Sequence, residues 1–215
     1  MDGMAICSNG ALVLDLACER VLRHRPLPSE IAVEVIHALR ERMPDVCFAI
    51  ETESRFALEP AFEGAWEGWK LSPGTLFGDA LELVTVPVTK LIARDATRPT
   101  DELAAISTEV VGERAVVSHG GRWVVEINVT GVSKGAALEE LAAELGIDSR
   151  HAVAFGDYPN DLPMLAWAGK SIAPANAHSS VLAEVDEVTE ANDEDGVALA
   201  IERLLVARAN GQTSV

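Results

Sequence analysis

The feature that most constrains this chain is a short polar segment directly after an apolar run. Residues 152–155 read Ala-Val-Ala-Phe, and residues 156–161 read Gly-Asp-Tyr-Pro-Asn-Asp. The run predicts a buried parallel strand, and open α/β sheets bind ligands at the carboxyl ends of such strands. Mg²⁺ takes one or two carboxylates together with phosphate oxygens. The segment therefore predicts a magnesium site for phosphate chemistry, with Asp157 and Asp161 as its ligands.

The last third of the sequence alternates between helical and strand patterns. Apolar residues recur at helical spacing between Lys134 and Gly146, which predicts a helix ended by that glycine. Alternation of helices and strands is typical of a parallel sheet. The expected elements are this first helix, a strand at 152–155, a short helix at 162–167, a strand at 171–173 and a closing helix at 197–206.

Two dipeptides predict hairpins in the earlier part of the chain. Asn9-Gly10 and Gly120-Gly121 each stand between two apolar runs, which is a signal for a turn between antiparallel strands. The fold class expected is therefore α/β. Residues 1–20 and 129–215 would form a doubly wound, Rossmann-like core with a parallel sheet, and residues 21–128 would form an inserted α+β domain.

The inserted block contains two helical patterns. Ser29 and Thr100 stand at their starts, and both are predicted to cap a helix. Residues 85–94 predict a strand in which Pro87 argues for an edge position or an early break. Residues 53–79 show no clear period and are expected to be irregular.

Composition excludes several kinds of partner. The 215 residues carry a formal net charge of −17, a field that repels nucleic acid and anionic membranes. No run of eighteen apolar residues and no signal peptide is present, so no membrane partner is expected. The three cysteines have no CxxC spacing, which favours a reducing cytoplasmic environment.

Each candidate site residue also has an ordinary structural interpretation. Asp157 and Asp161 suit a polar loop with a helix cap, since aspartate favours both roles. Lys134 fits a solvated surface lysine, and Asn9-Gly10 is first of all a hairpin turn. The position of the acidic pair directly after a buried strand favours the metal site. The five histidines show no ligand spacing, so none is predicted to bind metal.

Five short motifs occur in a fixed order along the chain. They are Asn9-Gly10-Ala11, Gly-Val-Ser-Lys-Gly at 131–135, the segment 156–161, Asn176-Ala177 and Glu-Asp-Gly-Val at 194–197. With the strand or helix expected beside each of them, the chain resembles the Cof-type sugar-phosphatase branch of the haloacid dehalogenase-like hydrolases. The resemblance covers nearly the whole chain, and it implies that residues 21–128 are a cap domain.

The resemblance also implies roles for the matching positions. Family members hydrolyse phosphate monoesters through an aspartyl-phosphate with the help of Mg²⁺. By this likeness Asp157 ligates Mg²⁺, and Asp161 holds a metal-bound water or the geometry of Asp157. Lys134 is the catalytic lysine that neutralises phosphoryl charge. Asn160 donates to a phosphate oxygen, and Asn9 with Gly10 contacts substrate where the core meets the cap.

One part of the family pattern is missing from the 215 residues. Family members begin with a strand that ends in Asp-x-Asp-Gly-Thr, which supplies the nucleophile and the acid/base. The only Asp-x-Asp-Gly string here is at 193–196, and its context predicts a solvated loop and helix cap. We therefore expect a core that is truncated at its N-terminus, with a chain that is nearly inactive by itself.

Two function hypotheses follow from the sequence. The first is a Mg²⁺-dependent phosphatase of small phosphorylated metabolites, in which this chain lacks the nucleophile segment. The second is a non-catalytic remnant that acts as a binding or interaction module. In either case an incomplete parallel sheet exposes strand edges, which favours self-association.

Overall fold

The structure, a computed structural model, describes residues 3–62, 71, 73–121 and 123–210. The chain divides into two compact units, Met1–Val132 and Ser133–Val215. The predicted division into a core of residues 1–20 with 129–215 and a cap of residues 21–128 places the boundaries differently, and it stays a prediction.

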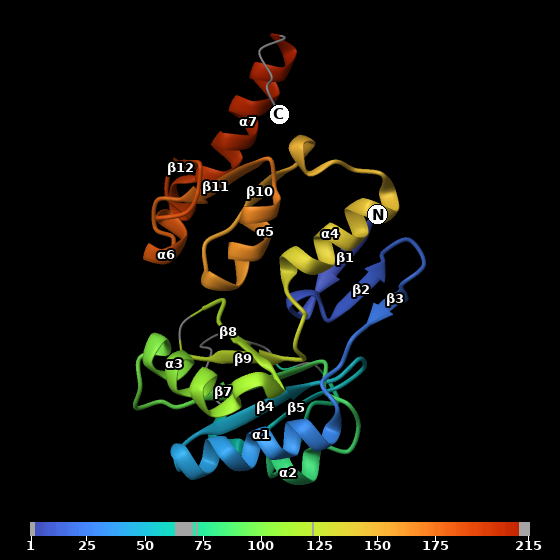
Figure 1. The fold of residues 1–215 in the computed structure, drawn as a ribbon, viewed down its shortest axis with the longest axis vertical. Coiled ribbons are helices and arrows are strands. Elements are labelled where there is room, and N and C mark those ends of the chain that lie inside the picture. Colours follow the sequence, from blue (N-terminus) through green and yellow to red (C-terminus); the bar gives the residue numbers. More distant parts are fainter. Residues whose placement is uncertain (1–2, 63–70, 72, 122, 211–215) are drawn as a thin grey trace. The chain divides into compact units, whose positions relative to one another are not determined.

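A six-stranded sheet forms the centre of the first unit (Figure 1). The strand order is β6-β5-β4-β7-β9-β8, and every pair is antiparallel except β5 with β6. The strands are β4 (Cys47–Glu51), β5 (Phe56–Leu58), β6 (Leu76–Phe77), β7 (Lys90–Arg94), β8 (Val116–Ser118) and β9 (Val125–Asn128). The helices of this unit in the described ranges are α1 (Ser29–Arg42), α2 (Ala80–Leu83) and α3 (Thr100–Val111).

The apolar spacing of α1 determines how it packs. Ala32, Val35, Ile36 and Leu39 are three or four residues apart, so they lie on one side of the helix, and all four are fully buried. Residues of β4 alternate between the two faces of the sheet. Phe48 and Ile50 join the cluster under the helices, whereas Cys47 and Ala49 join a smaller cluster on the opposite face.

Three further strands of the first unit form a separate antiparallel sheet. They are β1 (Met4–Cys7), β2 (Leu12–Asp15) and β3 (Arg20–His24). A 3₁₀ turn at Ser8–Gly10 joins β1 to β2, and Asn9 adopts a left-handed backbone with φ 61° that asparagine tolerates. The predicted hairpin at Asn9-Gly10 is confirmed, and so is the one at Gly120-Gly121, since β8 pairs antiparallel with β9.

The second unit contains a parallel sheet of three strands in the order β10-β11-β12. The strands are β10 (Val153–Phe155), β11 (Lys170–Pro174) and β12 (Glu187–Thr189). Helices separate them along the chain: α4 (Lys134–Leu145), α5 (Leu162–Trp167), α6 (Ser179–Leu182) and α7 (Gly196–Ala209). The predicted α/β fold class with a Rossmann-like parallel sheet is confirmed.

Some local predictions were wrong. Ser29 and Thr100 are the first helical residues of α1 and α3, and the positions before them are Pro28 and Pro99, so neither side chain caps its helix. The strand expected over 85–94 begins only at Lys90. It lies between β4 and β9, so Pro87 marks an early break and not an edge.

The segment 53–79 is only partly irregular. It contributes the short strands β5 and β6, and residues 63–70 and 72 of it lie outside the described ranges. Among the helices that the structure describes, none has the length and apolar character needed to cross a membrane.

Candidate functional site

The loop after β10 folds back around the carboxylate of Asp161. One carboxylate oxygen, Oδ2, accepts hydrogen bonds from the backbone N–H groups of Asp157 at 3.0 Å and Tyr158 at 3.1 Å. The other oxygen, Oδ1, accepts from Nζ of Lys134. Asp161 is only 4% exposed, so its charge is offset by these three donors. Asp161 thus holds the loop and the lysine together.

Two glycines make this close packing sterically feasible. A Cβ at position 156 would lie 2.5 Å from Cβ of Asp161, and a Cβ at position 135 would lie 2.3 Å from the carbonyl oxygen of Pro163. Both approaches are too short for any side chain. Gly135 directly follows Lys134 at the start of α4, so the tight contact between α4 and α5 brings the ammonium group to Asp161.

Asp157 differs from Asp161 in its surroundings. It is exposed at the carboxyl end of β10. Although the residue as a whole is exposed, its carboxyl group is partly shielded from water. This desolvation and, to a smaller extent, repulsion from Asp161 raise the pKa of Asp157, whereas Lys134 lowers it. A divalent cation would favour the charged form of this carboxylate. Asp157 therefore fits Mg²⁺ as an oxygen ligand, whereas both oxygens of Asp161 already accept hydrogen bonds from the protein.

Asn160 lies in the same loop but is buried. It belongs to the 3₁₀ turn Pro159–Asp161 and is 7% exposed. The second unit therefore brings together four of the predicted site residues at the carboxyl edge of its parallel sheet. These are Lys134, Asp157, Asn160 and Asp161.

The two other predicted site residues belong to the first unit. The side-chain amide of Asn9 donates to Glu126 Oε2 at 3.0 Å, to Asn128 Oδ1 at 3.1 Å and to Ser118 Oγ at 3.4 Å. Gly10 is buried beside it with φ 100°, a backbone conformation that favours glycine. Asn9 thus ties the β1–β2 turn to strands β8 and β9 of the larger sheet.

Sequence reasoning assigned no site role to several residues at the same edge of the parallel sheet. The N–H of His178 donates to the carbonyl oxygen of Asp157 at 2.8 Å. Asn176 donates through Nδ2 to Asn192 Oδ1 at 2.6 Å, and its own Oδ1 accepts from the N–H of Asn192 at 3.1 Å. The Asn176-Ala177 motif already pointed to Asn176, whereas the only sequence signal for His178 and Asn192 was their position after a strand.

These features define an α/β protein with a lysine and carboxylates at the carboxyl ends of its parallel strands. The sequence matches the profile of the haloacid dehalogenase-like hydrolases over residues 1–201. The chain belongs to that family.

Curated relatives cover only part of this chain. It is 42% identical over 88 residues to the 5-amino-6-(5-phospho-D-ribitylamino)uracil phosphatase YwtE of Bacillus subtilis. The matched stretch covers 41% of this chain and 31% of the relative. It is 36% identical over 97 residues to the phosphatase YbjI of Escherichia coli, which is named for the same substrate. This match covers 45% of this chain and 36% of the relative. The chain thus spans well under two thirds of these relatives' length.

Solved structures agree in fold over most of the chain. A haloacid dehalogenase-like hydrolase from B. subtilis matches with a TM-score of 0.79 and 22% identity, covering 95% of this chain and 80% of that one. The sugar phosphatase BT4131 matches with a TM-score of 0.78 and 20% identity, and the match covers 93% of this chain and 75% of that one.

Proposed function

We propose that this protein takes part in the Mg²⁺-dependent hydrolysis of small phosphorylated metabolites, of the sugar-phosphate type, through an aspartyl-phosphate. The observation that carries the proposal is the cluster of Lys134, Asp157 and Asp161 at the carboxyl edge of the parallel sheet. Membership of a hydrolase family supports it. A magnesium ion bound there would lower the charge barrier to attack on a phosphate ester.

The roles proposed for the residues follow from their surroundings. Asp157 supplies the carboxylate for Mg²⁺, because it is exposed and gains a counter-charge on binding the ion. Asp161 positions the backbone of Asp157 and orients Lys134. Lys134 places its ammonium beside the phosphoryl oxygens, and Asn160 donates to one of them. The oxygens of Asp161 already accept three hydrogen bonds, which supports the positioning role and leaves room for about one further donor such as a metal-bound water.

Asn9 and Gly10 are proposed to contact substrate as well. The amide nitrogen of Asn9 donates to Ser118, Glu126 and Asn128, and these bonds hold in place the turn that would present Asn9 and Gly10 to substrate. For the substrate we propose a phosphate ester of a polyhydroxylated chain, with or without a pyrimidine ring. The names of the curated relatives support this class.

The 215 residues alone are proposed to be nearly inactive. Their one Asp-x-Asp-Gly string, at 193–196, lies in a 3₁₀ turn and at the start of α7 and not at the end of a strand. Losing the nucleophile of a well-studied hydrolase costs about 10⁶ in turnover. The same observation favours the second candidate function, a non-catalytic binding module. Self-association through exposed sheet edges and a cytoplasmic location stay predictions.

Two assays test the proposal. The 215-residue chain with Mg²⁺ and p-nitrophenyl phosphate should release no measurable product, and robust hydrolysis abolished by Asp157→Ala would contradict the inactivity. Adding a homologous segment that ends in Asp-x-Asp-Gly-Thr, fused or in trans, should then give activity that is lost in Lys134→Ala and in Asp157→Ala. Lys170→Ala is the matched control, because Lys170 pairs with Glu187 in the same unit.

The second assay also separates the two candidate functions. If the supplemented protein unfolds cooperatively at a higher temperature yet hydrolyses nothing in a broad panel of phosphorylated metabolites, the non-catalytic function is supported. Calorimetry with Mg²⁺ should show weak binding, since Asp157 is a single carboxylate, and Asp157→Asn should abolish it.

A further inference from the structure

A pocket of about 430 Å³ lies at one end of the large sheet in the first unit. Its lining comes from the loop between β7 and α3, from the first residue of α3 and from the residue two positions before β9: Ala96, Thr97, Arg98, Pro99, Thr100 and Trp123. Ala93 pairs with Val125, so the end of β7 and the start of β9 lie side by side and bring the two segments together. The volume is within the range of about 300–1,000 Å³ that is typical of small-molecule sites.

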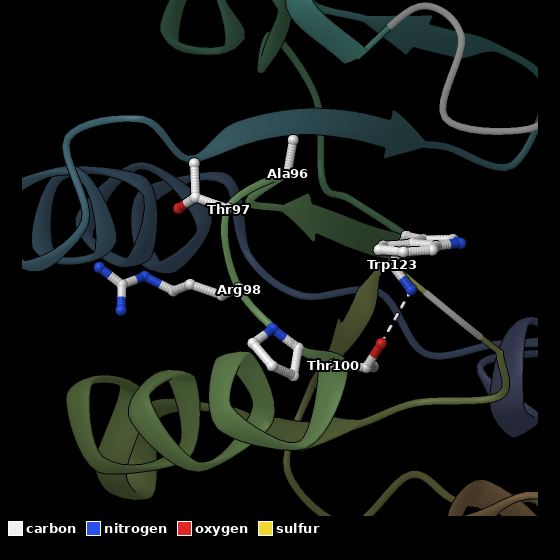
Figure 2. Close-up of a pocket in the computed structure, with 6 residues that line it drawn as sticks. Ala96, Thr97, Arg98, Thr100 and Trp123 are labelled. Carbon is white, nitrogen blue, oxygen red and sulfur yellow. Dashed lines mark hydrogen bonds between the residues drawn. The ribbon is translucent and has the colours of Figure 1, made fainter.

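The backbone conformation and the exposure of Trp123 are both unusual for a tryptophan. Its φ of 77° lies in the left-handed region, which is rare for a bulky side chain, and the residue is 51% exposed. Its backbone N–H donates to Oγ1 of Thr100 at 2.8 Å, as Figure 2 shows, and this bond stabilises the conformation. The chain therefore keeps a large indole face open to solvent at the pocket instead of burying it.

The charges at the pocket disfavour an anion. In Figure 2 the Arg98 side chain extends away from the indole of Trp123. Its Nε donates to Asp95 at 2.9 Å and its Nη1 to Glu102 at 2.8 Å, so two carboxylates face one guanidinium. Phosphate would gain little attraction here. The remaining surface is formed by an alanine, a proline, threonines and the indole, which suits an uncharged flat group.

We propose that this pocket binds an uncharged planar ring of the pyrimidine type, which stacks on the indole of Trp123. The inference rests on the proposed function for the kind of molecule that carries the ring, since the curated relatives are named for a phosphate ester of a uracil. Stacking on an aromatic side chain is available to every base, because each has a π-face. Trp123 is then the residue that holds the ring in this pocket.

The test uses the full 215-residue chain and uridine, which has the ring but no phosphate. The indole N–H resonance of Trp123, assigned by its loss in Trp123→Phe, should shift in a saturable way as uridine is added. Calorimetry measures uridine binding in the variants that lack the indole, and Trp123→Ala should weaken it by about 5- to 140-fold, the usual cost of removing one stacking partner. Trp123→Phe should retain binding, because the phenyl ring still offers a flat face.

A second set of variants tests the role of the Thr100 hydroxyl. Thr100→Val removes the hydroxyl that accepts the backbone N–H of Trp123 and should weaken uridine binding, whereas Thr100→Ser keeps a hydroxyl and should retain it. Thr108→Val is the matched control, since the Thr108 hydroxyl donates to Ala104 O within the same helix and lies away from the pocket. It should leave binding unchanged.

Two outcomes would overturn the inference. Either uridine leaves the Trp123 resonance unmoved, or Trp123→Ala binds uridine as well as the parent chain does. A shift with glucose but not with uridine would also overturn it, because the pocket would then select a sugar. None of these readouts needs turnover, magnesium or Lys134, so they leave the proposed phosphatase function standing.

Discussion

The two units of this protein differ most in how much apolar surface they bury. In the described residues, the main core of the first unit joins twenty buried side chains under α1, α2 and α3. The corresponding cluster of the second unit joins four: Ala154, Leu165, Ala173 and Val181. Burial stabilises by roughly 25 cal/mol per Å² of apolar surface, so the first unit gains far more from its own core.

The closing helix of the second unit exposes apolar side chains. On α7, Leu205 is 60% and Val206 is 61% exposed. Its proposed site residues are held by hydrogen bonds and a lysine–carboxylate pair, and not by a large core. The unit with the candidate catalytic groups therefore depends on polar contacts for its local structure. The unit with the Trp123 pocket is stabilised by a large apolar core.

The largest expected effect tests the two cores directly. Leu39→Ala removes a fully buried side chain from α1 and should cost about 2–5 kcal/mol of stability. Leu205→Ala on α7 removes an exposed side chain and should change stability by less than about 0.5 kcal/mol. Urea unfolding, with amide hydrogen exchange to assign each transition to its unit, measures both. Equal costs would remove the contrast between the units.

A smaller effect separates the two aspartates of the candidate site. Asp161→Asn weakens three hydrogen bonds to a buried carboxylate, one of them from Lys134, and should cost roughly 1.5–3 kcal/mol. Asp157→Asn should stay within about 0.5 kcal/mol, because the residue is exposed.

The same pair of variants checks the division of roles. Thermal unfolding of the second unit measures stability, and calorimetry measures Mg²⁺ binding. Asp157→Asn should lose the metal while keeping the fold. If Asp157→Asn unfolds the second unit and Asp161→Asn does not, the assignment of Asp161 as the positioning residue is wrong.

The smallest expected effect concerns pH. A hydrogen bond from Thr189, with further help from Arg203, lowers the pKa of Glu190 from 4.5 to about 2. Because the folded-state pKa lies below the unfolded value, this carboxylate stabilises the second unit above pH 4.5 and loses that contribution as pH falls toward 2. Glu190→Gln should make the melting temperature of the second unit depend less on pH between about 2 and 4.5.

The pH effect should be small and sensitive to salt, since Glu190 lies at the surface. Glu184→Gln, another exposed position of the same unit, serves as the control. If Glu190→Gln reduced the pH dependence of the first unit's melting temperature equally, the effect would not be local to Glu190.

Much of the fold was predictable because its signals are local. The short helix expected at 162–167 is α5, and the closing helix expected at 197–206 lies within α7. Both hairpins followed from their turn dipeptides. By contrast β3 and β12 were missed, since β3 lacks a regular alternation of apolar and polar residues and β12, at three residues, is too short to show a period.

Cap positions were predicted less well than helices. Ser29 and Thr100 are residue types that favour caps, but Pro28 and Pro99 take the cap positions, and proline fixes the backbone there without needing a side-chain bond. The hydroxyl of Thr100 is instead used by Trp123, which lies 23 residues further along the chain. Propensity could not reveal that use.

By itself, the sequence determined the alternation of helices and strands, and hence the α/β class, and it identified the carboxylates after the buried strand. These follow from spacing and turn chemistry, which act between neighbours in the chain. Only the tertiary structure decided that Asp161 is held by Lys134 while Asp157 faces solvent, and that Trp123 lies open at a pocket. Those outcomes depend on which atoms meet when α4 packs on α5 and β7 lies beside β9, because burial and hydrogen bonding are set by contacts between distant residues.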